Sequence, residues 1–320
     1  MIAVIVPIYN TEKYLRETID SVICQTLSFA EHIRLILLDD ASTDGSFAIC
    51  EQYQKQYPKQ IVVKHYDTNQ GVSALRNEGV RIAGEMGDEL ITFLDSDDKL
   101  ADDAMEKAVQ YFDAHEDVFV AAIGIRYFDA YEGEQRLNWR FEKTDVVDIK
   151  RDYTYPHYYV GGVFLRHAVL DELHFDESLS FWEDALAVNQ VIVSQGKYGL
   201  IAGTHYYYRK REDESSLVDT AWHKKERYTT LLSSGYGQLF AYSRKKHHRI
   251  IPYVQYMVAY HMRLMMMKSK QSIIEEILSE EELAALRDDV QKVLKKIKVK
   301  YILQIPTSLP IIEGMLCLLF

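Results

Sequence analysis

The sequence has few cysteines, no surplus of basic residues and no long apolar run. Its three cysteines lie in apolar surroundings without metal-type spacing, which favours free thiols in a reducing compartment. The 37 basic and 48 acidic residues give a formal charge of −11, which argues against binding to nucleic-acid backbones. The N-terminal residues lack the pattern of a signal peptide, and no stretch is long enough to span a bilayer. We therefore expect a cytoplasmic protein that binds no nucleic acid.

Short apolar runs rich in β-branched residues alternate with helical patterns over the first 126 residues. The predicted strands are Ile2–Ile8, Ile33–Leu38, Ile61–His65, Leu90–Leu94 and Val118–Arg126. The helical patterns between them include Gly71–Ala83 and Ala101–Ala114. This alternation predicts an α/β fold with a doubly wound, mostly parallel sheet. Ligands of such sheets bind at the carboxyl ends of the strands, so the residues that follow each strand are the candidates for a site.

The pattern is less regular after residue 127 and becomes mostly helical from about residue 221. Strand-like segments at Tyr159–Leu165 and His205–Arg209 mix with a helical pattern at Asp184–Ser194. The change in composition predicts an α/β domain over residues 1–215 and a smaller helical region over residues 216–320.

Three carboxylates within four residues follow the predicted strand Leu90–Leu94, at Asp95, Asp97 and Asp98. Such carboxylates repel one another unless a positive charge lies among them, and Mg²⁺ or Mn²⁺ prefers oxygen ligands and also binds phosphate oxygens. The alternative is that Asp97 or Asp98 caps the helix predicted from Ala101.

Two other strand ends carry side chains suited to a nucleotide. Asp40 ends the second predicted strand and can accept hydrogen bonds from a base or a ribose, although Ser42 and Thr43 nearby also suit an ordinary turn. Tyr9 ends the first strand and can stack on a base, or the segment is ordinary strand-to-helix punctuation.

Two helix starts carry further candidates. Gly71 permits an unusual backbone angle, and Arg76 can reach an acidic or phosphate group, or is a surface arginine. Asp184, in the segment Phe181–Asp184, is either a helix cap or a general base that deprotonates an acceptor hydroxyl.

Five segments together, PIYN, LLDDASTDGS, NQGVSALRN, FLDSDD and FWED, resemble in order and spacing the N-terminal catalytic domain of family-2 glycosyltransferases. The resemblance covers residues 1–215 and implies the GT-A fold, followed here by the helical region. It also implies transfer of a sugar, of hexosyltransferase type, from a nucleotide-diphosphate sugar, UDP-linked in first place, to a glycan or lipid-linked acceptor. The implied setting is the synthesis of a bacterial surface polysaccharide or teichoic-acid-like polymer.

The resemblance also implies roles for individual residues. Asp97 would ligate Mn²⁺ or Mg²⁺ within a DXD motif, Asp184 would be the catalytic base, and Trp182 and Glu183 would lie on the acceptor side. An in-line displacement with one base implies inversion at the anomeric carbon. The residues that would bind the donor are Pro7, Tyr9, Asp40, Asn69, Gly71, Arg76, Asp95, Ser96, Lys210, Arg211 and Ser215.

Two departures from the family pattern affect the details. Ala185 follows Asp184 where relatives often carry an aromatic residue, and the stretch from Tyr208 to Ser216 lacks a histidine that some relatives have. The alternatives are a nucleotidyltransferase and a catalytically inactive binding module. The first would need a basic phosphate-binding loop early in the chain, and the second is disfavoured because every expected carboxylate is present. The hypothesis requires Asp40, Asp97 and Asp184 to share one cleft around a cation and its diphosphate.

The C-terminal region contains a lysine-rich stretch over residues 292–300 in which lysines alternate with apolar residues. This pattern is typical of a basic amphipathic helix on the inner face of an anionic membrane, or of a packed helix with a solvated lysine face. Upstream, Ser279 and Glu282 form a capping-box pattern that predicts a helix start.

Overall fold

A computed structural model of the chain describes residues 1–212 and 220–319, which fall into two compact units. The first, called the sheet unit, comprises Met1–Val147, Tyr159–Glu177 and Lys197–Arg211. The second, called the helical unit, comprises Asp148–Tyr158, Ser178–Gly196 and Glu212–Phe320. The sequence placed one boundary near residue 215, whereas the two units interleave along the chain.

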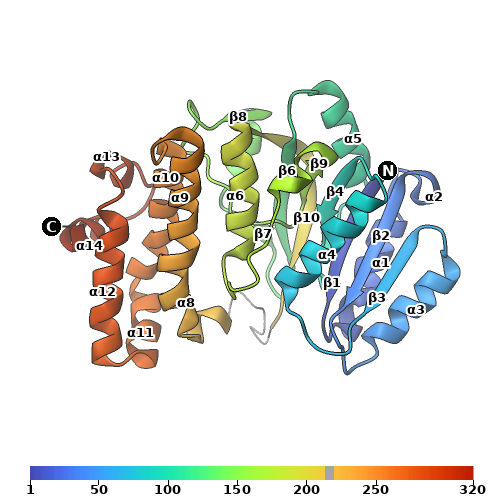
Figure 1. Ribbon diagram of the computed structural model, residues 1–320, viewed down its shortest axis with the longest axis horizontal. Helices are drawn as coiled ribbons and strands as arrows, with labels where there is room; N and C mark the ends of the chain where they lie inside the picture. The colour runs from blue at the N-terminus through green and yellow to red at the C-terminus, as the bar shows by residue number, and fades with distance from the viewer. Residues whose placement is uncertain (213–219, 320) are drawn as a thin grey trace. The chain divides into compact units, whose positions relative to one another are not determined.

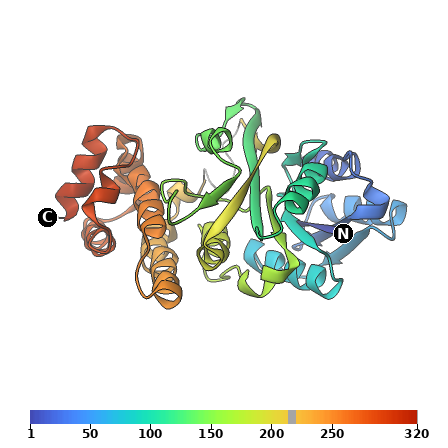
Figure 2. The same cartoon turned by 90° about the horizontal axis from the view of Figure 1, so that it is seen from above.

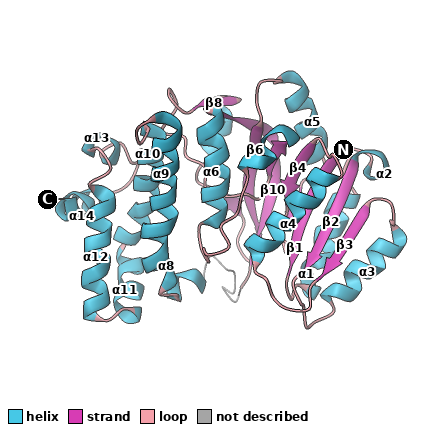
Figure 3. Cartoon of the chain, viewed as in Figure 1, coloured by secondary structure: helices cyan, strands magenta, loops and turns pink. Residues whose placement is uncertain are grey.

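The sheet unit is built on one ten-stranded sheet, drawn in magenta in Figure 3. Its hydrogen-bonded order is β3-β2-β1-β4-β9-β6-β10-β5, with β7 beside β6 and β8 beside β10. The strands are β1 Ile2–Ile8, β2 Ile33–Asp39, β3 Ile61–His65, β4 Leu90–Phe93, β5 Lys99–Leu100, β6 Val120–Asp129, β7 Gly133–Glu134, β8 Val146–Asp148, β9 Val163–Arg166 and β10 Lys197–Lys210. The predicted parallel pairing is present among the first four strands and between β6 and β10.

The strand β9 is the main departure from a purely parallel sheet. It runs antiparallel to both β4 and β6, between which it lies. A parallel neighbour needs a crossover helix, whereas β9 follows a long segment of short strands and turns. The predicted strand Tyr159–Leu165 is therefore shorter than expected, and its first residues form no part of a named strand.

Helices cover both faces of this sheet (Figures 1 and 2). One face packs against α1, α3 and α5, whose apolar residues share a core with Val4 and Val6 of β1. The opposite face packs against α4, where Gly79 meets Ile5: a Cβ at position 79 would lie 2.3 Å from a methyl carbon of Ile5. The helical elements of the sheet unit are α1 Glu12–Ile23, α2 Phe29–His32, α3 Ser46–Gln56, α4 Val72–Glu85, α5 Ala104–Ala114, η1 Asn138–Glu142 and η2 His167–Glu172.

The helical unit is organised around α6, whose apolar residues are buried on nearly all sides. Asn189, in the middle of α6, is fully buried and donates to the carbonyl oxygen of His157 at 2.9 Å, while Tyr253 donates to Asn189 Oδ1 at 2.8 Å. These bonds satisfy a polar group that would be costly to bury alone. The elements of this unit are α6 Glu183–Gln195, η3 Ala221–His223, α8 Glu226–Thr230, η4 Leu231–Gly235, α9 Tyr236–His247, α10 Pro252–Met262, η5 Arg263–Met266, α11 Lys268–Ile277, α12 Glu280–Leu294, α13 Val299–Ile302 and α14 Leu309–Leu319.

The lysine-rich stretch is not one continuous helix. The predicted capping box is confirmed at the start of α12, where Ser279 and Glu282 exchange both hydrogen bonds. That helix ends at Leu294, and the backbone N–H of Lys298 donates to Gln255 Oε1 at 2.9 Å before α13 begins. The apolar residues Val293, Leu294 and Ile297 are buried within the helical unit, while the neighbouring lysines stay exposed. Within residues 1–212 and 220–319, no helix combines the length and the hydrophobicity needed to cross a membrane.

Candidate active site

An acidic loop, Asp95–Asp98, follows β4 at the carboxyl edge of the parallel strands. The strand β1 lies between β2 and β4, and its register pairs Ile8 with Asp39. Asp40 therefore leaves the sheet at the same edge as the acidic loop. Strands are spaced by about 4.8 Å, so β2 and β4 lie roughly 10 Å apart.

The alternative that the acidic loop caps a helix is wrong. The helix α5 begins at Ala104 rather than Ala101, and its N-cap residue is Asp103. Asp97 and Asp98 lie several residues before that cap, so their carboxylates serve another purpose.

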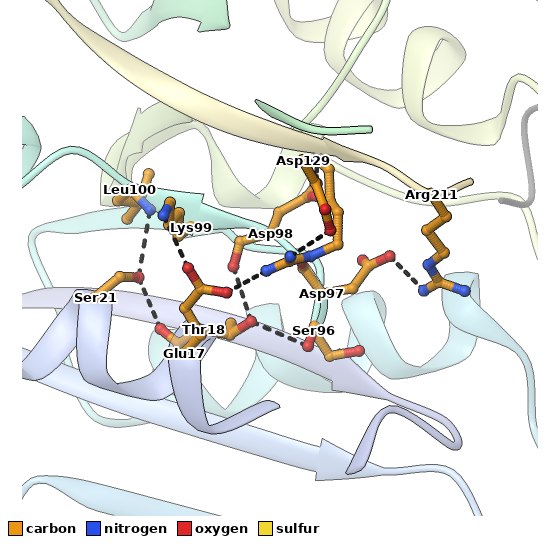
Figure 4. Close-up of polar contacts among 11 residues, drawn as sticks. Glu17, Thr18, Ser21, Ser96, Asp97, Asp98, Lys99, Leu100, Asp129 and Arg211 are labelled. Atoms are coloured by element: carbon orange, nitrogen blue, oxygen red, sulfur yellow. Dashed lines mark hydrogen bonds and ion pairs between the residues drawn. The ribbon is translucent and has the colours of Figure 1, made fainter. Parts of the chain in front are cut away.

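Side chains from α1 and β10 hold the acidic loop in place, and Figure 4 shows the contacts of Thr18 with this loop. Thr18 Oγ1 lies 3.0 Å from the carbonyl oxygen of Ser96 and 2.8 Å from that of Asp98. The Tyr206 hydroxyl donates to Asp98 Oδ2 at 2.8 Å and accepts the backbone N–H of Asp95 at 3.1 Å. Both Asp98 and Tyr206 are almost fully buried. The loop conformation is therefore fixed by the fold.

Arg209 makes a second set of bonds to the same loop. Its backbone N–H donates to Asp98 Oδ1 and its Nε to the carbonyl oxygen of Asp97, both at 2.7 Å. Its two terminal nitrogens form ion pairs with Glu17 and with Asp129. The planar guanidinium suits this task, because it presents several donors in a fixed geometry.

The acidic loop carries a surplus of negative charge. Burial raises the pKa of Asp97, and the neighbouring Asp95 raises it further, although Arg211 forms an ion pair with the Asp97 carboxylate and opposes the shift. Burial likewise raises the pKa of Asp98 well above its usual range, with contributions from Asp97 and Asp95. A cation at this loop would relieve both effects.

Arg76 is not the surface residue that one alternative proposed. It is 5% exposed, and its Nη2 donates to Asp95 Oδ1 at 3.0 Å. Its guanidinium also lies over the ring of Phe175, 5.6 Å from the centroid. The predicted residues Arg76 and Asp95 are therefore brought together, and α4 contributes a positive charge at the edge of the acidic loop.

The Asp40 carboxylate organises the segment that opens α4. Its Oδ1 accepts the backbone N–H of Gln70 at 2.6 Å, and its Oδ2 accepts that of Gly71 at 2.9 Å. Gly71 has a φ of +88°, a conformation that side chains disfavour. The Asn69 amide lies 3.5 Å from the Asp40 carbonyl oxygen. Asp40, Asn69 and Gly71 thus form one unit, and a carboxylate with two accepted bonds keeps further lone pairs for a ligand.

The loop after β1 is locked to the loop after β2. The backbone N–H of Asn10 donates to Ser42 Oγ at 3.0 Å, and that of Thr43 donates to Asn10 Oδ1 at 2.8 Å. Pro7 lies within β1. Tyr9, beside these loops, is 51% exposed, and its predicted stacking on a base stays a prediction.

The remaining predicted donor residues lie at the end of β10 or in the acidic loop. Lys210 Nζ lies over the rings of Tyr127 and Tyr208, 5.6 and 5.0 Å from the centroids. Ser96 is buried and contributes its carbonyl oxygen to the bond with Thr18. Ser215 lies outside the described residues.

The acidic loop fits a divalent cation that shares its ligands with a bound phosphate. In the part of the chain that the structure describes, no cluster of three or more His, Cys, Asp or Glu side chains has the arrangement of a metal site. Mg²⁺ and Mn²⁺ sites of nucleotide-binding enzymes need only one or two carboxylates, because substrate phosphates and water complete the shell. Asp97 and Asp95 supply that number, and each of them also pairs with an arginine, Arg211 and Arg76 respectively.

The predicted base Asp184 belongs to the helical unit, in the first turn of α6. The N-cap residue of α6 is Trp182, with a φ of 71° that is rare for a large side chain. Asp184 Oδ1 accepts the backbone N–H of Ala185 at 2.7 Å. Asp184 is therefore not the N-cap, and it lies with Glu183 where the helix dipole favours negative charge. Because Asp40 and Asp97 belong to the sheet unit, their convergence with Asp184 stays a prediction.

A buried arginine lies beside this segment in the helical unit. Arg227 is 2% exposed, and its guanidinium lies 3.7 Å from the ring centroid of Phe181 and 3.6 Å from that of Trp222. Its Nε and Nη1 are buried and have no hydrogen-bond partner among the described residues. A desolvated stack on an aromatic ring contributes about 2 kcal/mol, whereas burying an ion costs several kcal/mol and each unmade hydrogen bond adds about 1–3 kcal/mol.

The sequence did not identify Thr18, Tyr206 or Arg209 as parts of the site. Each is an ordinary residue of a helix or strand in the sequence, and each contacts the acidic loop only after folding. Asp98 offered a signal, because it extends the acidic motif by one residue, but its burial beneath Tyr206 is not visible in the sequence.

The chain is similar in sequence to known proteins. The model of the family described as Glycosyl transferase family 2 matches residues 3–174. The chain is 40% identical over 304 residues to the minor teichoic acid biosynthesis protein GgaA of Bacillus subtilis, a match that covers 94% of this chain and 68% of that protein. It is 36% identical over 265 residues to GgaB of the same organism, a match that covers 82% of this chain and 29% of that protein.

Solved structures show the same fold. Residues 1–349 of S. aureus TarS in complex with UDP-GlcNAc align with a TM-score of 0.74 and 20% identity, over 99% of this chain and 87% of that one.

A poly(ribitol-phosphate) beta-glucosyltransferase of Bacillus spizizenii is 27% identical over 219 residues, which is 66% of this chain and 32% of that protein. The chain belongs to glycosyl transferase family 2 and is a glycosyltransferase with the GT-A fold.

Proposed function

We propose that the chain is an inverting glycosyltransferase that moves a sugar from a UDP-sugar to a hydroxyl of a teichoic-acid-type polymer. The acidic loop at the carboxyl end of β4 is the observation that supports this most strongly, since its negative charge is only partly balanced by Arg76 and Arg211. The names of the relatives point to the same substrates, because GgaA serves minor teichoic acid biosynthesis and the TarS structure holds UDP-GlcNAc.

The residues of the sheet unit would bind the donor. The exposed ring of Tyr9 would stack on the uracil, and the further lone pairs of Asp40 would accept its N–H. Asp95 would contact the ribose or the sugar, and Asp97 with Asp95 would hold Mn²⁺ or Mg²⁺. The bound cation would supply positive charge to the diphosphate as it leaves. Arg211, which pairs with Asp97 here, and Lys210 would bind phosphate oxygens.

The helical unit would supply the base. Asp184 would take the proton of the acceptor hydroxyl as that oxygen attacks the anomeric carbon from the face opposite the diphosphate. A single displacement of this kind inverts the anomeric configuration, unlike hydrolysis by a retaining pair of carboxylates. Trp182 and Glu183 would lie on the acceptor side of this base.

The experiment is a screen of UDP-, GDP- and CDP-sugars for metal-dependent hydrolysis and for transfer to glycerol-phosphate or ribitol-phosphate oligomers. Asp184→Asn is expected to lower transfer at least about 10²-fold, in the range that removal of a general base costs. Calorimetry should show that this variant still binds UDP-sugar. Asp288→Asn, at an exposed position of α12, is the matched control. Near-normal transfer by Asp184→Asn would refute the assignment of the base.

The metal role has its own test. Asp97→Ala is expected to abolish the Mn²⁺-dependent part of UDP-sugar binding, because it removes the main carboxylate ligand. Calorimetric titration with and without Mn²⁺ measures this part. If Mn²⁺ strengthens the binding of UDP-sugar equally in the variant and in the wild type, the cation binds elsewhere. If the wild type hydrolyses none of the nucleotide sugars, the alternative of an inactive binding module would be favoured instead.

We also propose that the enzyme works at the inner face of the membrane. The apolar residues of the lysine-rich stretch are buried, so contact would rest on exposed charges such as Lys295, Lys296 and Lys298. Each basic residue near an anionic surface contributes about 1 kcal/mol. Cosedimentation with phosphatidylglycerol vesicles, compared at low and high salt, measures this contact.

A further inference from the structure

The guanidinium of Arg227 is a buried charge that forms no ion pair with any residue that the structure describes. It lies between the rings of Phe181 and Trp222, and within residues 1–212 and 220–319 neither Nε nor Nη1 has a hydrogen-bond partner. Buried arginines are normally paired with a carboxylate that satisfies their fork of donors. The two rings account for the faces of the guanidinium and leave these in-plane donors unused.

The surroundings of Arg227 add positive charge. Lys270 Nζ lies 4.4 Å from the ring centroid of Trp222, on which Arg227 also stacks. Arg227 and Arg263 both help to lower the pKa of His261, next to the dominant effect of burial. Burial lowers the pKa of Arg227 itself, and no carboxylate of the described residues contributes to that shift. The region therefore has the electrostatic character of an anion site.

The position of Arg227 links it to the acceptor segment. Phe181 directly precedes Trp182, Glu183 and Asp184, and it is only half-buried, so this side of the stack reaches the surface. An anion bound in the plane of the guanidinium would lie beside the start of α6. A phosphodiester suits this geometry, because Nε and Nη1 lie on different edges of the guanidinium and a non-bridging oxygen can accept a charge-assisted N–H bond at either edge.

We propose that Arg227, held between Phe181 and Trp222, binds a phosphodiester group of the acceptor polymer. The inference rests on the proposed function, which makes the acceptor a polyol-phosphate chain. The protein would thereby recognise the repeating charge of the polymer, while Asp184 acts on its hydroxyl. Binding of the acceptor would supply a hydrogen-bond acceptor to Nε or to Nη1 of Arg227, which have none among the described residues.

The test measures the Kd of a synthetic glycerol-phosphate hexamer by calorimetry on the full chain, without UDP-sugar. Inorganic phosphate is titrated in parallel, and an uncharged glycerol oligomer serves as the neutral probe. Arg227→Met keeps an unbranched apolar stem, although a shorter one, and removes the charge. We expect it to raise the Kd for the hexamer by about ten- to a hundredfold, the value of one or two charge-assisted hydrogen bonds. Arg287→Met, which removes an exposed charge of α12, should leave the Kd unchanged.

The melting temperature separates binding from a structural role. A buried charge without a counterion predicts that Arg227→Met melts at or above the temperature of the wild type in the absence of ligand. A much lower melting temperature together with an unchanged Kd would overturn the proposal. If the Met variant does not fold, Arg227→Lys decides: it keeps the charge without the planar fork and should raise the Kd about tenfold, and a normal Kd overturns the proposal.

The outcomes also separate this inference from the proposed function. Wild-type hydrolysis of UDP-sugars with no effect of Arg227→Met on hexamer binding refutes the inference alone. Absence of hydrolysis with a clear effect on hexamer binding refutes the proposed function and supports the anion site. If Arg227→Met weakens the binding of the hexamer and of inorganic phosphate equally, Arg227 is a general phosphate site and recognition of the polymer is overturned. A larger effect on the binding of the hexamer supports recognition of the polymer. If the uncharged glycerol oligomer binds the wild type tightly, and Arg227→Met weakens its binding as much as that of the hexamer, the role of charge in binding would be overturned.

Discussion

His261 makes the stability of the helical unit depend on pH. It lies at the end of α10, is 9% exposed, and its Nδ1 lies 2.6 Å from the Tyr236 hydroxyl oxygen. Burial, with smaller contributions from Arg227 and Arg263, lowers its pKa to about 3. The unfolded chain binds a proton at this residue below about pH 6.5, whereas the folded chain does not. Stability that is fully present above about pH 6.5 is therefore lost as the pH falls toward 3.

The magnitude follows from the interval between the two pKa values. Each pH unit below about 6.5 costs about 1.4 kcal/mol, so lowering the pH from about 7.5 to about 5.0 removes roughly 2 kcal/mol through this group. His261→Asn removes the titration and keeps a polar atom near the Tyr236 hydroxyl. The variant is expected to be less stable at neutral pH, by about 1–3 kcal/mol, because it leaves a cavity. On acidification from about pH 7.5 to about 5.0, the variant should lose less of its free energy of unfolding than the wild type, by roughly 2 kcal/mol.

Urea unfolding at constant ionic strength, followed by tryptophan fluorescence, measures both quantities. Trp182 and Trp222 are buried in the helical unit, so their emission follows the unfolding of this part of the chain. His248→Asn is the matched control, because His248 is exposed and has a φ of 58°, which asparagine tolerates. Equal pH dependence in the wild type and His261→Asn would refute the reasoning, since the buried imidazole would then not be the group that titrates.

Two further predictions concern the sheet unit. The ion pair with Arg81 holds the pKa of Glu78 at about 2. The contribution of this pair to the stability of the fold is therefore present above pH 4.5 and is lost as the pH falls toward 2. Glu78→Gln should cost only about 1 kcal/mol at neutral pH, because solvent screens the pair, and the cost should vanish at the acid end of acid-unfolding curves. Tyr206→Phe should cost about 1–3 kcal/mol in urea unfolding, because it leaves the Asp98 carboxylate and the Asp95 N–H without the hydroxyl that both contact. The same variant should bind UDP-sugar more weakly by calorimetry, and unchanged stability and binding would mean that water replaces the hydroxyl.

The strands, and the sheet edge that carries Asp40 and the acidic loop, could be predicted because their signals are local. The runs rich in β-branched residues predicted β1 and β3 with their observed bounds, Ile2–Ile8 and Ile61–His65. A parallel order then places the carboxyl ends of β2 and β4 at one edge, so Asp40 and the acidic loop could be grouped from the order of the strands alone. The direction of β9 could not be predicted, because no crossover pattern precedes it.

The bonds that hold the acidic loop could not be predicted because they are long-range. Tyr206 and Asp98 are 108 residues apart in the sequence, and Arg209 and Glu17 are 192 apart. No periodicity or spacing links residues at such distances. A long-range bond also lies at the break after α12, where the backbone N–H of Lys298 donates to Gln255, 43 residues away in the sequence.

The chain passes between the sheet unit and the helical unit five times, so neither unit corresponds to one continuous stretch of the gene. A truncation after residue 215 would keep α6 but remove α9 and α10, with Tyr253, the donor to Asn189. The apolar faces of α6 would then be exposed to water and prone to aggregation. Any minimal soluble version for crystallography or engineering therefore needs to retain the C-terminal helices, even if only the sheet unit is of interest.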